Sequence, residues 1–407
     1  MRALCVLLAV ISLVSCKKTE YSPVSMQEDV ALLASDSLMG RETGTDAERM
    51  AADYLASRFE GMGLKAIGTE GYFQDFAFKP SLNPHEEVKA VDSLGDGMVS
   101  GRNVVAMIDN QAATTVVLGA HYDHLGMGGE GSLHRGEPAI HNGADDNASG
   151  VALMLHLAEE LKSGPSNSNY VFIAFSGEEK GLLGSAYWVR NATVDTAKIN
   201  YMVNMDMVGR LKDSTVAVHG VGTSPAFKQT LFANNDYGLN ISEFDSGVGP
   251  SDFTSFYLAD IPVLGFFTGQ HEDYHKPGDD ADKINYEGME LLGDYIMSII
   301  NDLQDDGELA FRRTKNESEE VPAFKVGLGV VPDYLYTGEG MRIDGVSAGK
   351  TGEKAGLKKG DVVKKLGDIE VTDMMSYMKA LATFENGQKT MVTIERDGEL
   401  MEVEVEF

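Results

Sequence analysis

The sequence is poor in cysteine, in tryptophan and in basic residues. Its only two cysteines, Cys5 and Cys16, both stand near the N-terminus of the 407-residue chain. Lysine and arginine number 34 against 63 acidic residues, which gives a formal net charge of -29 at pH 7. A chain this acidic repels a phosphate backbone, so we expect no nucleic acid partner. Past the N-terminal segment, no apolar run is long enough to span a membrane as a helix.

The one long apolar run is the N-terminal segment MRALCVLLAVISLVSC. Arg2 precedes about a dozen apolar residues, a length typical of an export signal and too short for a stable membrane span. The run ends in LVSC, which resembles a bacterial lipobox, so cleavage before Cys16 would leave that cysteine to carry lipid. An ordinary signal peptide with an incidental cysteine is the alternative.

We therefore predict a lipoprotein signal peptide over residues 1–15 and a tether over residues 16–24. The protein would be anchored by Cys16 in the cell envelope, on the periplasmic or surface side of a bacterial membrane, with the outer membrane preferred. Since Cys5 would be removed with the signal, the mature chain would have no internal disulfide.

Residues 25–303 alternate short apolar runs with amphipathic segments. The apolar runs are bounded by turn residues and are typical of buried strands: NVVAMI, TVVLGA, YVFIAF, YMVNMDM and IPVLGFF. Helical spacing of apolar residues marks the segments 44–64, 151–162, 224–238 and 286–303, the first with a Thr/Asp start and a Gly stop. This pattern predicts an α/β domain with a mostly parallel mixed sheet and helices on both faces. Sites in such folds form at the carboxyl ends of the strands.

The composition changes after Leu303. Residues 304–323 are charged, polar and interrupted by Gly and Pro, which predicts a linker. Residues 324–407 then carry strand-like runs around one helical segment at 373–384. The last run, ELMEVEVEF, alternates apolar and acidic residues as a half-buried antiparallel strand does. A small β-rich domain is therefore expected at the C-terminus.

Five segments of the first domain place metal-type ligands after a predicted strand or inside one. They contribute His121 and Asp123, Asp145 and Asp146, Glu178 and Glu179, Asp206, and His271 and His275. Each alone has an ordinary interpretation, such as a solvated turn or acidic residues at a helix start. Together, mixed imidazole and carboxylate ligands at one edge of a sheet suit zinc and similar divalent ions. Asp206 is the sharpest case, because a carboxylate in an apolar strand needs a cation or strong donors.

The paired acids suggest two ions. Two cations held close together need a shared carboxylate, so one member of the Asp145 and Asp146 pair would bridge them. One member of the Glu178 and Glu179 pair would remain free as a base. Two such ions activate a water and polarise a carbonyl, which predicts hydrolysis of an amide.

In chain order, the segments AHYDH, NGADDNASG, SGEEKGLLGS, NMDMVG and DYHKPGDD resemble the di-zinc aminopeptidase family, exopeptidases related to bacterial leucyl aminopeptidase. The resemblance covers roughly residues 25–303. It implies an enzyme that removes N-terminal residues from peptides with free N-termini and binds two zinc ions per chain, for which cobalt or manganese would substitute. It also implies a cis peptide bond between Asp146 and Asn147.

The resemblance assigns roles residue by residue. It implies His121 and Asp206 as ligands of one zinc, Glu179 and His275 as ligands of the other, and Asp146 as the bridge between them. Glu178 would be the general base, and Asp123 would orient His121. Tyr274 would contact the oxyanion, with a packed aromatic as the alternative.

The chain departs from the family pattern at Phe253, where the stretch after Ser251 and Asp252 often has a histidine. Asp252 is interpreted as a helix-start residue rather than a substrate contact. The histidines without a family role are expected to be solvated or to lie at the rim of the site: His124, His134, His141 and His271.

The C-terminal unit resembles a PDZ domain over most of residues 324–407. Its segment GLGV resembles the loop whose backbone amides hold a peptide carboxylate, which implies Gly327, Leu328, Gly329 and Val330 as peptide-binding residues. The alternative is a small structural barrel without a ligand.

Three other functions remain open. A glutaminyl cyclase with a single zinc or a carboxypeptidase could use the same fold, and a non-catalytic protein could bind peptides through the PDZ-like unit alone. The sequence indicates no oligomeric state.

Overall fold

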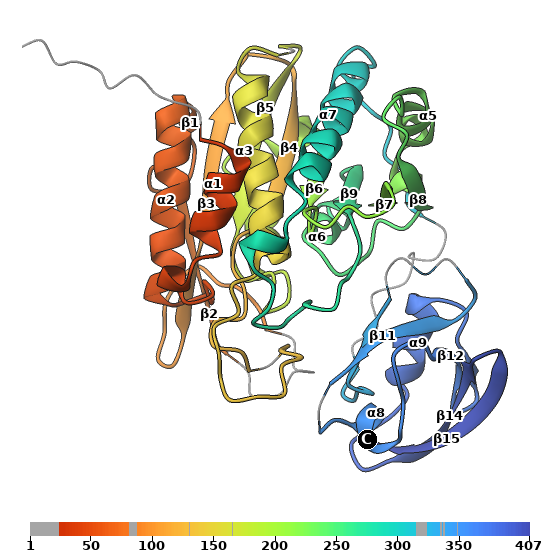
Figure 1. The fold of residues 1–407 in the computed structure, drawn as a ribbon. Coiled ribbons are helices and arrows are strands. Elements are labelled where there is room, and N and C mark those ends of the chain that lie inside the picture. The colour runs from red at the N-terminus through yellow and green to blue at the C-terminus, as the bar shows by residue number, and fades with distance from the viewer. Residues whose placement is uncertain are drawn as a thin grey trace, which may run out of the picture.

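The structure is a computed structural model that describes residues 24–80, 88–129, 131–164, 166–314, 324–333, 336, 338–347 and 349–407. A larger α/β domain precedes a smaller β-rich domain (Figure 1). The predicted signal peptide and Cys16 lie outside the described residues. Within the described ranges, no helix has the length and apolar character needed to cross a membrane.

A mixed sheet forms the centre of the larger domain. In the described part of the chain it has nine strands in the order β1-β3-β5-β4-β6-β9-β7-β8, with β2 paired to β3. Their bounds are β1 Lys65–Ala66, β2 Phe73–Phe78, β3 Val99–Ile108, β4 Thr114–His121, β5 Ser168–Phe175, β6 Ile199–Met205, β7 Thr215–His219, β8 Asn240–Phe244 and β9 Val263–Phe267.

The central strands β5, β4, β6 and β9 are parallel neighbours, so their carboxyl ends lie at one edge of the sheet. Strands β3 and β7 join them in antiparallel orientation. The predicted mixed α/β sheet is confirmed, although the NVVAMI run, in β3, belongs to the antiparallel part.

Helices cover both faces of this sheet (Figure 1). Alternate side chains of β5 enter different cores: Phe172 packs in the core with α1, α2, α3, α5 and α7, whereas Ile173 packs in the core with α4 and α6. The bounds are α1 Met26–Leu33, α2 Asp46–Met62, α3 Gly150–Leu161, α4 Leu183–Arg190, α5 Pro225–Ala233, α6 Phe253–Tyr257 and α7 Tyr286–Leu303.

The helix ends follow the local signals in the sequence. The Thr45 side chain accepts a hydrogen bond from the Glu48 amide at the start of α2, and Gly63, with φ of 76°, ends that helix. Asn285 caps α7 in the same way, through the Gly288 amide. The predicted helices in the segments 44–64 and 286–303 are confirmed.

The smaller domain is built around a second sheet with the strand order β10-β11-β12-β14-β15, where β13 pairs with β12. Its elements are β10 Val330–Pro332, β11 Met341–Val346, α8 Thr351–Lys354, β12 Val362–Leu366, β13 Ile369–Glu370, α9 Met374–Leu381, β14 Lys389–Arg396 and β15 Glu399–Glu406. Strand β10, which follows the GLGV segment, stands at an edge of this sheet.

The two domains are in contact through the segment between β4 and α3. Arg135 lies 3.1 Å from the Glu353 carboxylate and donates to the Val346 carbonyl oxygen at 3.4 Å. Part of the predicted linker also packs against the larger domain, since the Leu309 amide donates to Asn200 and the Arg312 amide to Thr223.

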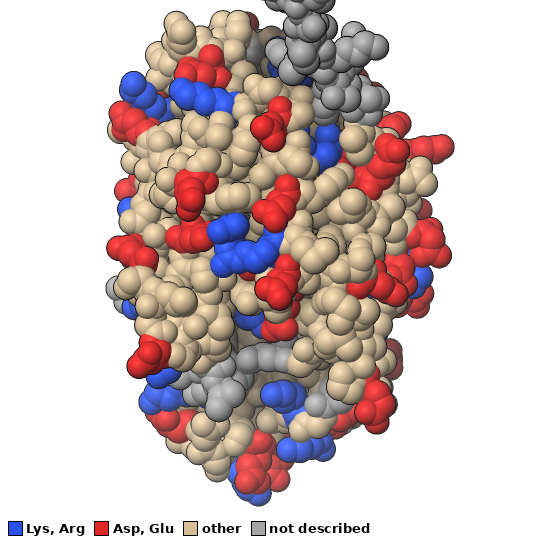
Figure 2. Space-filling model, turned by 90° about the vertical axis from the view of Figure 1, so that its left-hand side faces the viewer, with Lys and Arg blue, Asp and Glu red and all other residues tan. Residues whose placement is uncertain are grey.

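Figure 2 shows acidic and basic side chains interspersed over the face on the side of α2, without one dominant patch.

Candidate active site

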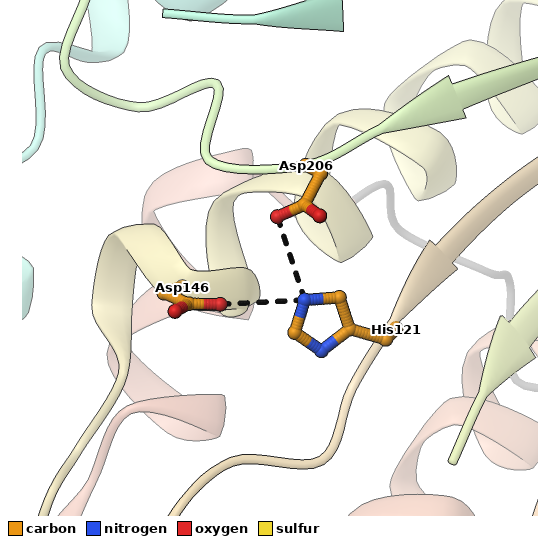
Figure 3. Close-up of side chains that lie close together, drawn as sticks. All are labelled: His121, Asp146 and Asp206. Atoms are coloured by element: carbon orange, nitrogen blue, oxygen red, sulfur yellow. Dashed lines mark ion pairs between the residues drawn. The ribbon is translucent and has the colours of Figure 1, made fainter. Parts of the chain in front are cut away.

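Three predicted ligands from separate segments meet at the carboxyl edge of the sheet. The Nε2 atom of His121, the last residue of β4, lies 3.3 Å from Asp146 Oδ1 and 3.4 Å from Asp206 Oδ1 (Figure 3). Asp206 directly follows β6 rather than lying inside it, so the expectation of a carboxylate within the strand is wrong by one position. Its side chain remains 18% exposed.

A second group of side chains shares Asp146 with the first. The His275 Nε2 atom lies 3.1 Å from Asp146 Oδ2 and 3.4 Å from Glu179 Oε2. The two oxygens of Asp146 therefore face different imidazoles, as a bridging carboxylate requires. All five residues predicted as metal ligands are brought together.

The loop that carries Asp146 is held by groups next to the site. The Asp279 carboxylate accepts hydrogen bonds from the amides of Asp145 and Asp146 at 2.9 and 3.1 Å. Asp145 points away from the ligands, because its carboxylate accepts from the Gly209 amide at 2.6 Å and lies 3.1 Å from His271 Nε2. The expected cis peptide bond between Asp146 and Asn147 is confirmed.

Glu178 opens onto the same cavity as the ligands. Its amide donates to Asp123 Oδ1 at 3.1 Å, and its carbonyl oxygen accepts from the amides of Gly181 and Leu182 in a tight turn. Asp123 is thus attached to the backbone of Glu178. Toward His121, the closer acceptor for Nδ1 is the Asp123 carbonyl oxygen at 3.1 Å, while the carboxylate is 3.7 Å away.

Burial and mutual repulsion set the protonation of this cluster. Burial raises the pKa of Glu178 well above its usual value, and Glu179 and Asp206 raise it further against the opposing effect of His121. Burial would also raise the pKa of Asp146, but the imidazoles of His121 and His275 hold it well below its usual range. In the absence of bound cations, these effects favour positive charge beside Asp146 and a proton on Glu178.

The donor set fits divalent cations. The Nδ1 atoms of His121 and His275 lie near backbone carbonyl oxygens, of Asp123 at 3.1 Å and of Gly131 at 2.8 Å, so each Nδ1–H can donate there. That leaves both Nε2 lone pairs directed at the carboxylates, as in metal-binding histidines. Among the described residues that line the cavity, there is no lysine or arginine to neutralise the carboxylates. Zinc ions would bind the two Nε2 lone pairs and would also neutralise the carboxylates.

A buried arginine joins the two segments that carry the ligands. Arg41 donates to the carbonyl oxygens of Tyr122 at 2.7 Å, Asn142 at 2.6 Å and Gly143 at 3.0 Å, and also to that of Leu33. Burial lowers its pKa only to about 10, so the guanidinium remains charged at neutral pH. Sequence analysis missed this residue, since no motif marks it.

The cavity beside the ligands has a volume of about 350 Å³ and a largely apolar far wall. Phe253, Phe266 and Phe267 line that wall, and His219 is stacked between Phe253 and Phe244 with ring centroids 5.7 and 4.8 Å away. Phe253, the departure from the family pattern, is therefore a wall residue.

Tyr274 also lines the cavity, where its ring stacks on the His275 imidazole with centroids 3.9 Å apart.

The histidines without a predicted role do not behave alike. His134 is exposed and His271 is partly exposed, as expected. The expectation is wrong for His124 and His141, which are both buried. His124 lies 2.8 Å from Glu179 Oε1 and enters the second ligand group. Its place in AHYDH, three residues after His121, was the only signal for this position.

Asp252 is also more deeply placed than a helix-start residue needs to be. It precedes α6, yet its side chain makes no capping hydrogen bond and is completely buried. Burial raises its pKa to about 7, and the neighbouring Asp123 and Asp206 carboxylates add to the effect.

In the smaller domain, the predicted peptide-binding segment leads directly into β10. Leu328 is buried in the core, and Gly329 has φ of 65°, a conformation that favours glycine. A Cβ atom at Gly329 would lie 2.2 Å from the Lys350 Cβ. The loop conformation thus depends on this glycine.

The fold and the site together define a peptidase-like chain with an appended domain. Residues 103–300 match Peptidase family M28, and residues 313–407 match the PDZ domain. The chain therefore contains a region similar to peptidase family M28, followed by a region similar to a PDZ domain.

Curated relatives support the family. The chain is 32% identical to the Aminopeptidase YwaD of Bacillus subtilis over 39% of this chain and 37% of that protein. It is 31% identical to the Alkaline phosphatase isozyme conversion protein of Escherichia coli over 55% of this chain and 66% of that protein. It is 31% identical to the Probable lipoprotein aminopeptidase LpqL of Mycobacterium tuberculosis over 41% of this chain and 34% of that protein. The chain thus spans between about a third and two thirds of the length of these relatives.

Solved structures share the fold of the larger domain. BSAP, a zinc aminopeptidase from Bacillus subtilis, has a TM-score of 0.53 at 18% identity and covers 71% of this chain and 96% of its own. A Bacteroides thetaiotaomicron glutaminyl cyclase has a TM-score of 0.55 at 19% identity, over 69% of this chain and 98% of its own. At these identities the likeness establishes the zinc exopeptidase fold.

The environment of His219 predicts a pH dependence of stability. Burial lowers its pKa to about 4, whereas the unfolded chain has a histidine pKa near 6.5. As the pH falls from about 6.5 to 4, the unfolded state binds a proton that the folded state excludes, so the free energy of unfolding falls. Replacing His219→Phe should remove about 3 kcal/mol of this loss.

Urea unfolding of the metal-free protein near pH 8 and near pH 4 would measure the effect. His134→Phe, at an exposed histidine, is the matched control. It should leave the difference between the free energies of unfolding near pH 8 and near pH 4 as it is in wild type. An identical pH dependence for wild type and His219→Phe would contradict the burial of a neutral His219.

Proposed function

We propose that the protein is a zinc-dependent aminopeptidase that releases N-terminal residues from peptides. The observation that carries the proposal is the division of the Asp146 carboxylate between two ligand groups beside one cavity, with Glu178 at its wall. His121, Asp146 and Asp206 would hold one ion, and Asp146, Glu179 and His275 the other. Bound zinc would supply Lewis acidity toward a water and toward the substrate carbonyl.

Glu178 is suited to transfer the protons of the reaction. Its raised pKa and its position on the cavity would let it accept a proton from the attacking water and donate it to the leaving amine. Asp123 and the turn to Leu182 fix the backbone that carries it.

The remaining cavity chemistry suits a peptide N-terminus. The carboxylates of Glu178 and Asp206 would accept hydrogen bonds from a free α-ammonium group, and Tyr274, which lines the cavity next to His275, would contact the substrate oxygen. The phenylalanine wall around Phe253 would take an apolar side chain.

The Glu178→Gln variant tests the general base. It keeps the shape of the side chain but removes its capacity to take a proton, so kcat on aminoacyl chromogenic substrates should fall by about 10²–10⁴. Zinc content should stay near two ions per chain, measured by elemental analysis. Glu272→Gln, at an exposed position nearby, should leave both values unchanged.

A glutaminyl cyclase is the second candidate, since a solved cyclase shares the fold. One zinc per chain, with release of ammonia from peptides that begin with glutamine, would favour it. Retention of aminopeptidase activity by Glu178→Gln would contradict the role of that residue.

We further propose that the PDZ domain adds a peptide as a strand along β10, with its C-terminal carboxylate at residues 327–330. The sheet-edge position of β10 and the glycine-dependent loop support this mode. In the full chain, Gly329→Val should weaken binding of a free-acid peptide at least about tenfold, because the new side chain meets Lys350.

Fluorescence anisotropy with matched free-acid and C-terminally amidated peptides would measure this binding. The amidated peptide is the ligand control and should bind weakly to both proteins. Equal affinity for both peptides would argue for a structural domain without a carboxylate site.

We also propose that Cys16 anchors the protein in a bacterial envelope membrane through lipid. The lipobox-like LVSC sequence and the similarity to a probable lipoprotein aminopeptidase support this. Cys16→Ser should move the protein from the membrane to the soluble fraction after cell fractionation. A variant that stays with the membrane would exclude lipid on Cys16 as the anchor.

A further inference from the structure

His124 lies behind the second ligand group rather than on the cavity surface. Its side chain is completely buried, and it does not belong to the wall that His275 and Glu179 line. It comes from the loop directly after β4, which also carries His121 and Asp123. A buried imidazole at this position needs a polar partner.

The polar contacts of His124 are concentrated at Nδ1. This atom lies 2.8 Å from Glu179 Oε1 and 3.9 Å from Asp146 Oδ2. Nε2, by contrast, has no hydrogen-bond partner in the part of the chain that the structure describes. One ring nitrogen is thus directed at the same two carboxylates that face His275.

The two imidazoles approach these carboxylates from different directions. The rings of His124 and His275 have centroids 5.7 Å apart and planes inclined by 71°. Nδ1 of His124, an oxygen of Asp146 and an oxygen of Glu179 all lie within 4.8 Å of one another. A single cation between them would accept all three donors, and His275 Nε2 lies 3.1 Å from Asp146 Oδ2 and 3.4 Å from Glu179 Oε2, beside the same two carboxylates.

We propose that His124 is a fourth protein ligand of the second metal ion. That ion would be held by His124, Asp146, Glu179 and His275, whereas the first has only His121, Asp146 and Asp206. Four protein ligands resemble a closed, structural zinc site, and three ligands leave positions for water and substrate. The first ion is then the one that meets the substrate, and the second is bound more tightly. This inference rests on the metal binding in the proposed function.

The other nearby histidine has no such freedom. His141 uses both ring nitrogens, with Nε2 2.7 Å from the Ser132 hydroxyl and Nδ1 2.8 Å from the Ala139 carbonyl oxygen. The contrast identifies His124 as the histidine available to a metal.

The alternative to ligation is a hydrogen bond from the His124 Nδ1–H group to Glu179. The His124→Asn variant distinguishes this hydrogen bond from metal ligation. The asparagine amide can replace the donor at the Nδ1 position, but it is a poor zinc ligand. Ligation predicts that His124→Asn binds the first zinc normally and the second at least about 100-fold more weakly than wild type. Competition titration with a chromogenic chelator would measure both constants. His134→Ala, at an exposed histidine, should match wild type.

A measurement on the wild-type protein does not depend on how a variant folds. With cobalt in both sites, each ligated histidine gives one exchangeable, strongly shifted N–H proton signal in the NMR spectrum. Ligation by His124 predicts three such signals, from His121, His124 and His275, and a hydrogen bond alone predicts two.

The outcomes separate this inference from the proposed function. If wild type binds two ions and cleaves peptides, but His124→Asn keeps both affinities and cobalt gives two signals, His124 ligation is overturned and the aminopeptidase stands. If His124→Asn loses the second ion and cobalt gives three signals, ligation is supported whether or not the protein acts as an aminopeptidase. Wild type that binds fewer than two ions would overturn both.

Discussion

The concentration of negative charge at the carboxyl edge of the sheet is the constraint on which the rest of the structure depends. Asp146, Glu178, Glu179 and Asp206 share one cavity, and like charges so close together and so poorly solvated destabilise a fold unless cations or protons offset them. The parallel order of β5, β4, β6 and β9 makes the convergence unavoidable, since their carboxyl ends lie together. The imidazoles, together with the cations that we propose the site holds, would supply the positive charge that offsets these carboxylates.

The surrounding structure holds these charges in fixed orientations. Carbonyl oxygens next to His121 and His275 fix their tautomers, Asp279 fixes the loop of Asp146 through two amides, and Asp123 fixes Glu178 through one. Each of these contacts has a backbone carbonyl oxygen or amide on one side, so it depends on the path of the chain as well as on the Asp279 and Asp123 carboxylates. The site is preorganised by loops that rigid strands position.

The candidate metal ligands could be predicted from the sequence because charged residues are unusual within or directly after apolar strand segments. Aspartates in NGADDNASG and NMDMVG interrupt apolar segments, and such interruptions are visible without a structure. The periodicity of α7 and the caps of α2 are equally local signals. The antiparallel direction of β3 was not visible, because an apolar run carries no mark of its orientation.

Residues that act through the backbone or through distant segments also escaped. Arg41 looks like a surface residue in RETGTDAER, and only the fold brings it to carbonyl oxygens about 80 to 100 positions away. His124 has the appearance of a loop histidine until Glu179 is placed beside it. Asp252 looks like an ordinary helix start until the depth of α6 is known.

The position of Arg41 has a consequence for where the folding unit begins. The match to peptidase family M28 starts at residue 103, yet Arg41 ties the end of α1 at Leu33 to both ligand-bearing loops. Thr43 on the same segment donates to Asp123 at 2.9 Å. Residues 24–80 are therefore an integral part of the larger domain, and a chain cut at the family boundary would leave three loop carbonyl oxygens without their common donor.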